Sequence, residues 1–258
     1  MKNQISRILQ DKIKLCFIII LIALPSLEIS QYLWYHYKFG IELQAPMFAT
    51  FLSANTIGHI FQSLLLWFLP LYLLLITGSD SMEDYTTGYK NILIVKMGRK
   101  KYVLNKLTSS FITAFAIMLL GLLINFILVQ IILHKGTHVP FDINDVSNLP
   151  DSFLFELGYT HPLVTNLLFI LIVSFLAGLI SMVGTSLSIV LHDKKIVYAL
   201  TFAIWFLPIL SKNSLMYVTQ PFAEYDFDVI VPIFLWVFGF YLTIIGISYV
   251  WEVKIAKI

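Results

Sequence analysis

The sequence predicts an all-helical integral membrane protein, and three observations support this fold class. Hydrophobic residues make up 59% of the chain and charged residues only 12%, whereas a typical soluble domain is about 25% charged. The apolar residues form several runs that approach or exceed the roughly 20 residues a helix needs to cross a bilayer. Lys and Arg are concentrated in alternate connections between these runs. The 258 residues therefore accommodate about six spans in a single membrane domain, residues 1–258.

Six apolar segments are the expected spans. They are Leu15–Leu33, Thr56–Thr77, Thr108–Leu133, Pro162–Leu191, Ile196–Leu210 and Val229–Val250. The fifth is short and contains Pro208 near its end, so we expect it to be tilted, broken or continued by a partly inserted segment. The first follows a basic amino end, as a signal peptide does, but it is longer than the usual apolar core and no small-x-small cleavage site follows it. We therefore expect it to be a span.

The distribution of basic residues predicts the orientation. Of the 17 Lys and Arg residues, only Lys38, Lys135 and Lys212 fall in the connections that alternate with the basic ones. Those same connections also hold acids such as Asp142, Asp145, Asp151, Glu156, Glu224, Asp226 and Asp228. The positive-inside rule then predicts a multi-pass protein of the cell membrane with both termini in the cytoplasm. The net charge of +2 gives no indication of nucleic-acid binding.

The most charged segment, EDYTTGYKNILIVKMGRKKYVLNK from Glu83 to Lys106, lies between the second and third spans. Asp80 and Glu83 resemble a capping pair at a helix start, and Gly88 and Gly98 divide the segment into short pieces. The piece between the glycines is apolar on more than one side, so one side can lie on the membrane domain while another enters a partner. A positive-inside loop whose cations reach lipid headgroups accounts for the same pattern.

An acidic residue, a glycine five positions later, a hydrophobic patch, a basic residue and a Lys at the foot of the third span resemble the cytoplasmic loop of type-2 ABC exporter permeases. The matching residues are Glu83, Gly88, Leu93, Arg99 and Lys106. The resemblance implies a coupling helix that docks into a groove of a separate ATPase subunit. Many relatives carry a proline before the basic residue, where this chain has Met97 and Gly98.

Individual roles follow from that resemblance. Glu83 is the candidate for a polar contact with the ATPase or for capping the docking helix, and Gly88 permits the turn that directs it. Tyr89 and Leu93 are the candidate apolar anchors. Arg99 and Lys106 are expected to hold the loop at the headgroups.

The amino end predicts an amphipathic helix that lies in the membrane interface. Its apolar face holds Ile5, Ile8, Leu9, Ile13 and Cys16, and its polar face Asn3, Gln4, Arg7, Gln10, Asp11 and Lys14. It resembles the connecting helix that precedes the first span of the same permease family. A simple membrane-surface anchor has the same pattern.

Motifs for chemistry are missing from the sequence. It contains no G-x-x-x-x-G-K-[ST] phosphate loop and no H-E-x-x-H, and Gly184-Thr185-Ser186 lacks the second glycine of a nucleophile elbow. We therefore expect no enzyme and no cofactor in this chain, with ATP and Mg²⁺ bound by two copies of a partner ATPase. The resemblance also implies a second permease copy or a similar permease. It is nearest to bacterial peptide-export and bacteriocin-immunity permeases, which suggests a hydrophobic or amphipathic peptide as substrate, with drug or lipid export as the neighbouring possibility.

Two other classes fit the sequence: a secondary transporter driven by an ion gradient, and a non-transporting scaffold or receptor subunit. Secondary transporters place ionisable groups near the midplane, often within inverted repeats. We find no repeat, and we expect the cytoplasmic halves of the spans to be almost free of polar side chains. The polar exceptions fall mostly in the outer halves and are Glu28, His59, Gln62, Asn125, Gln130 and Asn166.

Glu28 and His59 are expected at nearly the same depth, near the outer ends of the first and second spans. A carboxylate in hydrocarbon is costly unless it is paired, so one hypothesis is that these two side chains meet. The alternative is that Glu28 reaches the outer headgroups. In the fourth span Ala177, Ser181, Gly184 and Ser188 recur at three- and four-residue spacing, which favours close helix packing over ligand binding.

Overall fold

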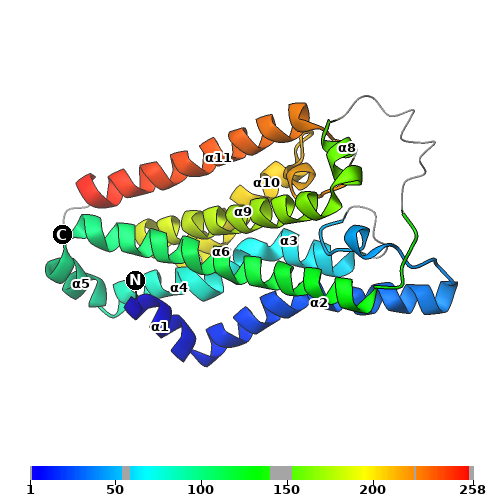
Figure 1. The fold of residues 1–258 in the computed structure, drawn as a ribbon. Helices are drawn as coiled ribbons and strands as arrows, with labels where there is room; N and C mark the ends of the chain where they lie inside the picture. Colours follow the sequence, from blue (N-terminus) through cyan, green and yellow to red (C-terminus); the bar gives the residue numbers. More distant parts are fainter. Residues whose placement is uncertain (1, 54–58, 140–152, 224, 256–258) are drawn as a thin grey trace.

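The computed structural model describes residues 2–53, 59–139, 153–223 and 225–255, and the helices among them form one elongated bundle (Figure 1). Within these ranges no β-strand forms, and Gln44 and His138 make an isolated bridge. The helices are α1 (Lys2–Gln10), α2 (Lys12–Phe39), α3 (Ile60–Leu73), α4 (Ser79–Thr86), α5 (Tyr89–Met97), α6 (Arg99–Ile132), α8 (Phe153–Thr160), α9 (Pro162–Leu191), α10 (Lys194–Leu210) and α11 (Phe227–Val250). Short 3₁₀-helices η1 (Pro46–Phe48) and η3 (Leu215–Val218) and π-helices η2 (Leu74–Gly78) and η4 (Trp251–Ile255) complete the set.

Within the described ranges, five helices are long and apolar enough to cross a membrane, which confirms the predicted class of helical membrane protein. They are Lys12–Phe39, Ile60–Thr86, Arg99–Ile132, Pro162–Leu191 and Phe227–Ile255. The predicted fifth span corresponds to α10, which has 17 residues and rises only about 25 Å. A hydrocarbon core is about 30 Å thick, so α10 alone does not meet the length of a full span.

The second long helix differs from the predicted span at its basic end. The predicted start at Thr56 lies outside the described residues, but the helix runs from Ile60 without a break through η2 to Thr86. Asp80 and Glu83 therefore lie within a helix, and the predicted capping pair is wrong. Gly78, just before α4, keeps helical backbone angles of −76° and −32°, because the chain has no turn there.

Local sequence does explain the other breaks. Asp11 separates α1 from α2. Its side chain caps α2 by accepting hydrogen bonds from the backbone N–H groups of Ile13 and Lys14. Asp193 caps α10 in the same way. Gly88 and Gly98 have positive φ values of 71° and 83°, which only glycine adopts without strain. They enclose α5, as the sequence predicted.

The centre of the bundle is α9, which packs against α6, α10 and α11. Its small residues Ala177, Ser181, Gly184 and Ser188 are buried. A Cβ atom added at Gly184 would lie 2.7 Å from Leu74 Cδ2, so the small side chain is needed for close approach. This confirms the predicted packing role of the stripe.

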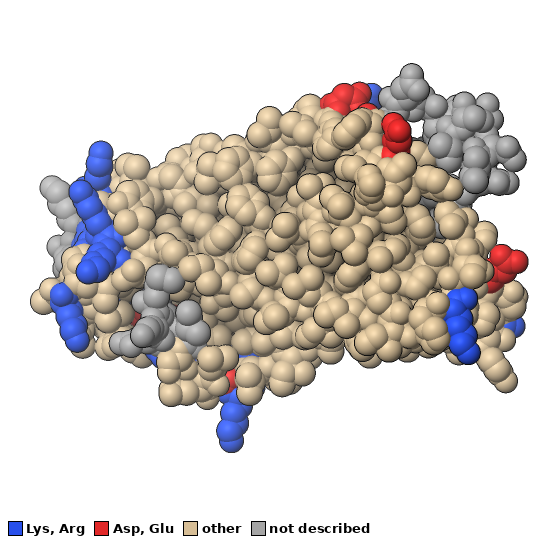
Figure 2. Space-filling view, in the orientation of Figure 1, with Lys and Arg blue, Asp and Glu red and all other residues tan. Residues whose placement is uncertain are grey.

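The two ends of the bundle differ in charge. In Figure 1, α1, α5 and η4 lie at one end, which we call the basic end, and α8 lies at the other. Most of the Lys and Arg side chains visible in Figure 2 gather at the basic end, while acidic side chains are seen towards the α8 end. The predicted segregation of charge is thus a property of the fold, although Asp142, Asp145, Asp151 and Glu224 lie outside the described residues.

Candidate functional site

At the basic end, α5 lies against the bundle with one face and is exposed on the other. Ile94 is buried, and Leu93 and Met97 pack against the main hydrophobic core. Tyr89, Ile92 and Val95 are 42%, 62% and 86% exposed. Leu93 is therefore not on the outer face, contrary to its predicted role as an anchor. Sequence reasoning missed Ile92 and Val95 as outward-facing residues because α5 is apolar in several directions.

The other predicted loop residues occupy different environments. Glu83 is exposed near the end of α4, where its carbonyl accepts hydrogen bonds from Thr87 N and the Thr86 and Thr87 hydroxyls. Arg99 begins α6 and donates to the Glu252 carbonyl at 3.4 Å. Lys106 is buried inside the bundle. The predicted placement of Lys106 at the headgroups is wrong, because a carboxylate in the bundle binds it.

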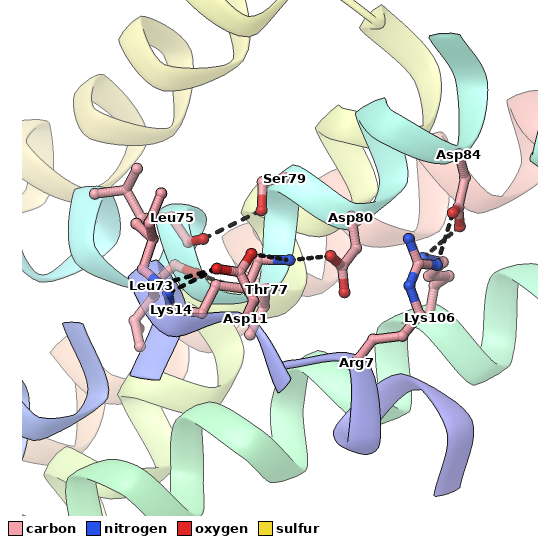
Figure 3. A network of polar contacts seen from close by, with 11 residues as sticks. Arg7, Asp11, Lys14, Leu73, Leu75, Thr77, Ser79, Asp80, Asp84 and Lys106 are labelled. Carbon is pink, nitrogen blue, oxygen red and sulfur yellow. Dashed lines mark hydrogen bonds and ion pairs between the residues drawn. The ribbon is translucent and has the colours of Figure 1, made fainter. Parts of the chain in front are cut away.

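That carboxylate belongs to Asp84, the centre of a buried ionic cluster that joins α1, α2, α4 and α6 (Figure 3). The Asp84 side chain is 0% exposed and lies 2.8 Å from Arg7 Nη1 and 2.7 Å from Lys106 Nζ. One helical turn earlier, Asp80 pairs with Lys14, whose Nζ is also 3.7 Å from Asp11. We call these six residues the α1 ion cluster. It contains three cations and three carboxylates, so its formal charges balance.

The α1 ion cluster corrects one expectation and fixes the position of the amino-terminal helix. The half of the bundle near the basic end is not almost free of polar side chains, because Asp80, Asp84 and Lys106 lie inside it. In the amino-terminal helices, Arg7 and Lys14 reach these carboxylates and Ile8 is buried in the main hydrophobic core. Leu9 and Ile13 are exposed.

The charge on Arg7 is stabilised by this geometry. Partial burial by itself lowers the pKa of the guanidinium, but the hydrogen bond and negative charge of Asp84 outweigh burial and raise the pKa above its ordinary value. Arg7 also lies 5.8 Å from the centre of the Tyr89 ring. It therefore links α1 both to the end of α4 and to the start of α5.

A second group of contacts surrounds Lys90, on the inner face of α5, and we call it the Lys90 junction. Lys90 Nζ lies 2.9 Å from Glu252 Oε1 in η4, 3.4 Å from the Ile189 carbonyl and 3.3 Å from His192 Nε2. The His192 ring stacks on Tyr85 with centroids 3.7 Å apart. Burial lowers the pKa of His192, and the charge of Lys90 lowers it further, against the opposite effect of Glu252.

Towards the α8 end, the predicted polar side chains bind backbone. Asn125 accepts from Phe51 N at 3.0 Å and donates to the Pro25 carbonyl at 2.8 Å. Gln62 donates to the Phe51 carbonyl, and Asn166 donates to the Met47 carbonyl. These side chains therefore hold the segment that contains η1 between the helices, which is a structural role.

Glu28 is buried, and its Oε1 lies 4.0 Å from His59 Nδ1. This distance is the longest that counts as an ion pair, and it supports the hypothesis that the two side chains meet. The alternative, in which Glu28 extends to the headgroups, does not fit its burial. Among the described residues, no group of three or more His, Cys, Asp or Glu side chains could hold a metal ion.

The fold and these buried contacts define a multi-pass helical membrane protein. The chain is 40% identical over 256 residues to "Uncharacterized protein YybM" of Bacillus subtilis (strain 168), an alignment that covers 98% of each chain. It belongs to the same family as YybM. No family model matches the chain, and no solved structure matches it.

Proposed function

We propose that this protein is the membrane-spanning subunit of an ATP-driven ABC exporter, energised by a separate ATPase. The observation that carries the proposal is α5: a short helix between two long ones, bounded by glycines with positive φ, with its inner face on the bundle and its outer face exposed. The outer face presents Tyr89, Ile92 and Val95 at the basic end. Such a ridge is suited to fill an apolar groove on a partner.

The path of the chain supports six crossings. The end of α9 and the start of α10 are joined by two residues, and Lys90 of α5 contacts both Ile189 and His192 there. By contrast, α11 begins beside α8, where Asp226 accepts from Phe153 N and Leu154 N. The chain therefore returns to the α8 end between α10 and α11, which supports counting α10 together with η3 as a shorter crossing in the proposed six-span topology.

In the proposed complex, two ATPase chains lie in the cytoplasm under two permeases, either two copies of this chain or this chain and a similar one. ATP binds with Mg²⁺ to the ATPases, whose closure pushes α5 so that the spans open a path out of the cell. The positive-inside rule places the basic end and both termini in the cytoplasm. The proposed substrate is hydrophobic or amphipathic, with a peptide as the first choice.

The α1 ion cluster favours a second candidate, an ion-gradient-driven transporter, because it places ionisable groups inside two long helices. However, Arg7, Lys14 and Lys106 are each within ion-pair distance of a carboxylate. The cavity beside Thr77, Asp80 and Lys106 measures only about 10 Å³, room for one water molecule at most. Fully paired charges without space for a hydrated ion favour a structural role, so we rank the exporter first.

Purification of a tagged permease from its native host tests the proposal. We expect an ABC ATPase to co-purify with the wild type. The double variant Tyr89→Ala with Ile92→Ala removes two of the three side chains of the outer ridge. We expect the permease to insert at normal abundance, while ATPase recovery and transport fall at least about tenfold. The reason is that apolar anchors often contribute more than about 1 kcal/mol each.

The matched control is Lys100→Ala with Lys101→Ala, which changes two residues at the start of α6 and leaves the ridge intact. It should change ATPase recovery little. Full ATPase recovery and transport without Tyr89 and Ile92 would contradict the docking role of α5. A wild-type permease that recovers no ATPase would contradict the proposed function itself.

A further inference from the structure

The inner face of α5 carries one charged residue that reaches far into the bundle. Lys90 is only 8% exposed although it lies at the second position of the helix, directly beside the exposed Tyr89. A lysine at such a position normally extends into water. Its burial means that partners inside the protein replace the hydration of its ammonium group.

Those partners come from elements far apart in the sequence. The Lys90 ammonium group contacts Glu252 in η4, the Ile189 carbonyl at the end of α9 and His192 before α10. It also lies 5.7 Å from the centre of the Tyr85 ring at the end of α4. The Lys90 side chain thus lies against the ends of α4 and α9, against η4 after α11, and against the turn into α10, all at the basic end of the bundle.

The strongest of these contacts leads to the last long helix. Glu252 is 3% exposed, and its ion pair with Lys90 is 2.9 Å long. The backbone around Glu252 is a π-helix, a conformation that is rare and concentrated at functional sites. Arg99, which follows the Gly98 break, donates to the Glu252 carbonyl. Charged groups in α5 and just after it therefore hold the end of α11.

We propose that Lys90 is the positioning residue through which movement of α5 reaches α11 and the turn between α9 and α10. This inference rests on the proposed function, because it takes the ATPase as the source of the movement. A buried ion pair suits such transmission. Separating Lys90 from Glu252 would leave two buried charges without partners, which is energetically costly. A displacement of Lys90 is therefore transmitted to Glu252. The outer face of α5 binds the partner, and Lys90 on the inner face passes the displacement on.

The experiment separates transmission from stability. Lys90→Met alone leaves Glu252 buried without its cation and is expected to destabilise the fold. The double variant Lys90→Met with Glu252→Met removes both charges and keeps side chains of similar length, a replacement that is often neutral or stabilising. Lys96→Met is the matched control, because Lys96 lies on the same helix and is exposed.

Spin labels report the movement in the complex purified with its ATPase. Cysteines replace the exposed Lys12, at the start of α2, and Lys254, in η4, in a Cys16→Ser background. We expect the wild type and Lys96→Met to change the distance between the labels when ATP and vanadate trap the ATPase. The double Met variant should retain wild-type ATPase recovery but lose this change, and transport per ATP hydrolysed should fall at least about tenfold.

The outcomes distinguish the two proposals. A normal distance change and normal transport per ATP in the double Met variant would overturn the role of Lys90 while leaving the exporter intact. Loss of ATPase recovery in the double Met variant would also overturn it, because Lys90 would then serve docking. If the wild type itself binds no ATPase, the exporter proposal fails, and the role of Lys90 fails with it.

Discussion

The two ends of the bundle are held together by different kinds of contact. At the basic end, ion pairs join α1 and α2 to α4, and α5 to η4. Towards the α8 end, neutral amides of Asn125, Gln62 and Asn166 bind the backbone of one inserted segment. These neutral hydrogen bonds mainly fix one loop, although Asn125 also joins α6 to α2. The ion pairs join one helix to another, so each helix depends on the position of its partner. Under the proposed function, the basic end is the part that transmits movement.

The largest effect is expected at Asp84. Asp84→Ala leaves Arg7 and Lys106 beside each other without a carboxylate, and we expect a loss of about 3–5 kcal/mol in unfolding free energy. Thermal or denaturant unfolding in detergent measures it. The control is Glu83→Ala, which changes the exposed neighbour and is expected to stay within about 0.5 kcal/mol. Equal stability of the two variants would mean that the cluster contributes nothing to the fold.

A smaller loss is expected from Asn125→Leu. The substitution leaves the N–H of Phe51 without its acceptor, and an unsatisfied buried donor costs about 1–3 kcal/mol. Asn213→Ala, at an exposed asparagine, is the control, and the same unfolding measurement applies. An effect as large as that of Asp84→Ala would remove the difference between the two ends.

The Glu28 and His59 pair is expected to contribute less, because its atoms are 4.0 Å apart and His59 is partly exposed. In a cycle of His59→Ala, Glu28→Gln and both together, we expect a coupling of about 0.5–1 kcal/mol. Glu28→Gln should recover part of the stability in the His59→Ala background, because a neutral amide depends less than a carboxylate on the contact that His59 supplied. Strictly additive effects would show that the two side chains do not interact.

The smallest effect concerns pH. The folded-state pKa of His192 is lowered, so the unfolded chain, with a pKa of about 6.5, binds the proton more readily. The unfolding free energy therefore falls as pH drops below about 6.5 and stops falling below the folded-state pKa. The groups that face His192 are Lys90, Glu252 and Tyr85.

His192→Gln should flatten this part of the pH dependence. The measurement is the difference in unfolding temperature between wild type and variant across that range. Parallel curves would show that His192 does not titrate differently in the two states.

Much of the fold could be predicted from local pattern. The apolar runs indicate the long helices, the distribution of Lys and Arg indicates the two ends, and Gly88 and Gly98 indicate the bounds of α5. The α1 ion cluster could not be predicted in this way, because Arg7 and Asp84 are 77 residues apart and a charged residue near a span end is ordinarily solvated. The outer face of α5 was also ambiguous: Ile92 and Leu93 are adjacent and equally apolar, and only packing on the bundle distinguishes them.

The π-helix η2 has a consequence for how related sequences can differ in length. In it the Ser79 N–H donates to the Leu74 carbonyl, five residues earlier instead of four, so the turn holds one extra residue. Each residue rotates a helix by about 100°, and Asp80 and Asp84 follow directly. A regular helix with the same number of residues would therefore rotate both carboxylates by about 100°, away from Lys14 and Lys106. Deleting one residue between Leu74 and Gly78 would instead remove the wide turn and leave the direction of both carboxylates nearly unchanged. Related sequences can therefore differ by one residue here and keep the two acids in place, provided that the longer sequence forms the wide turn and the shorter one a regular helix.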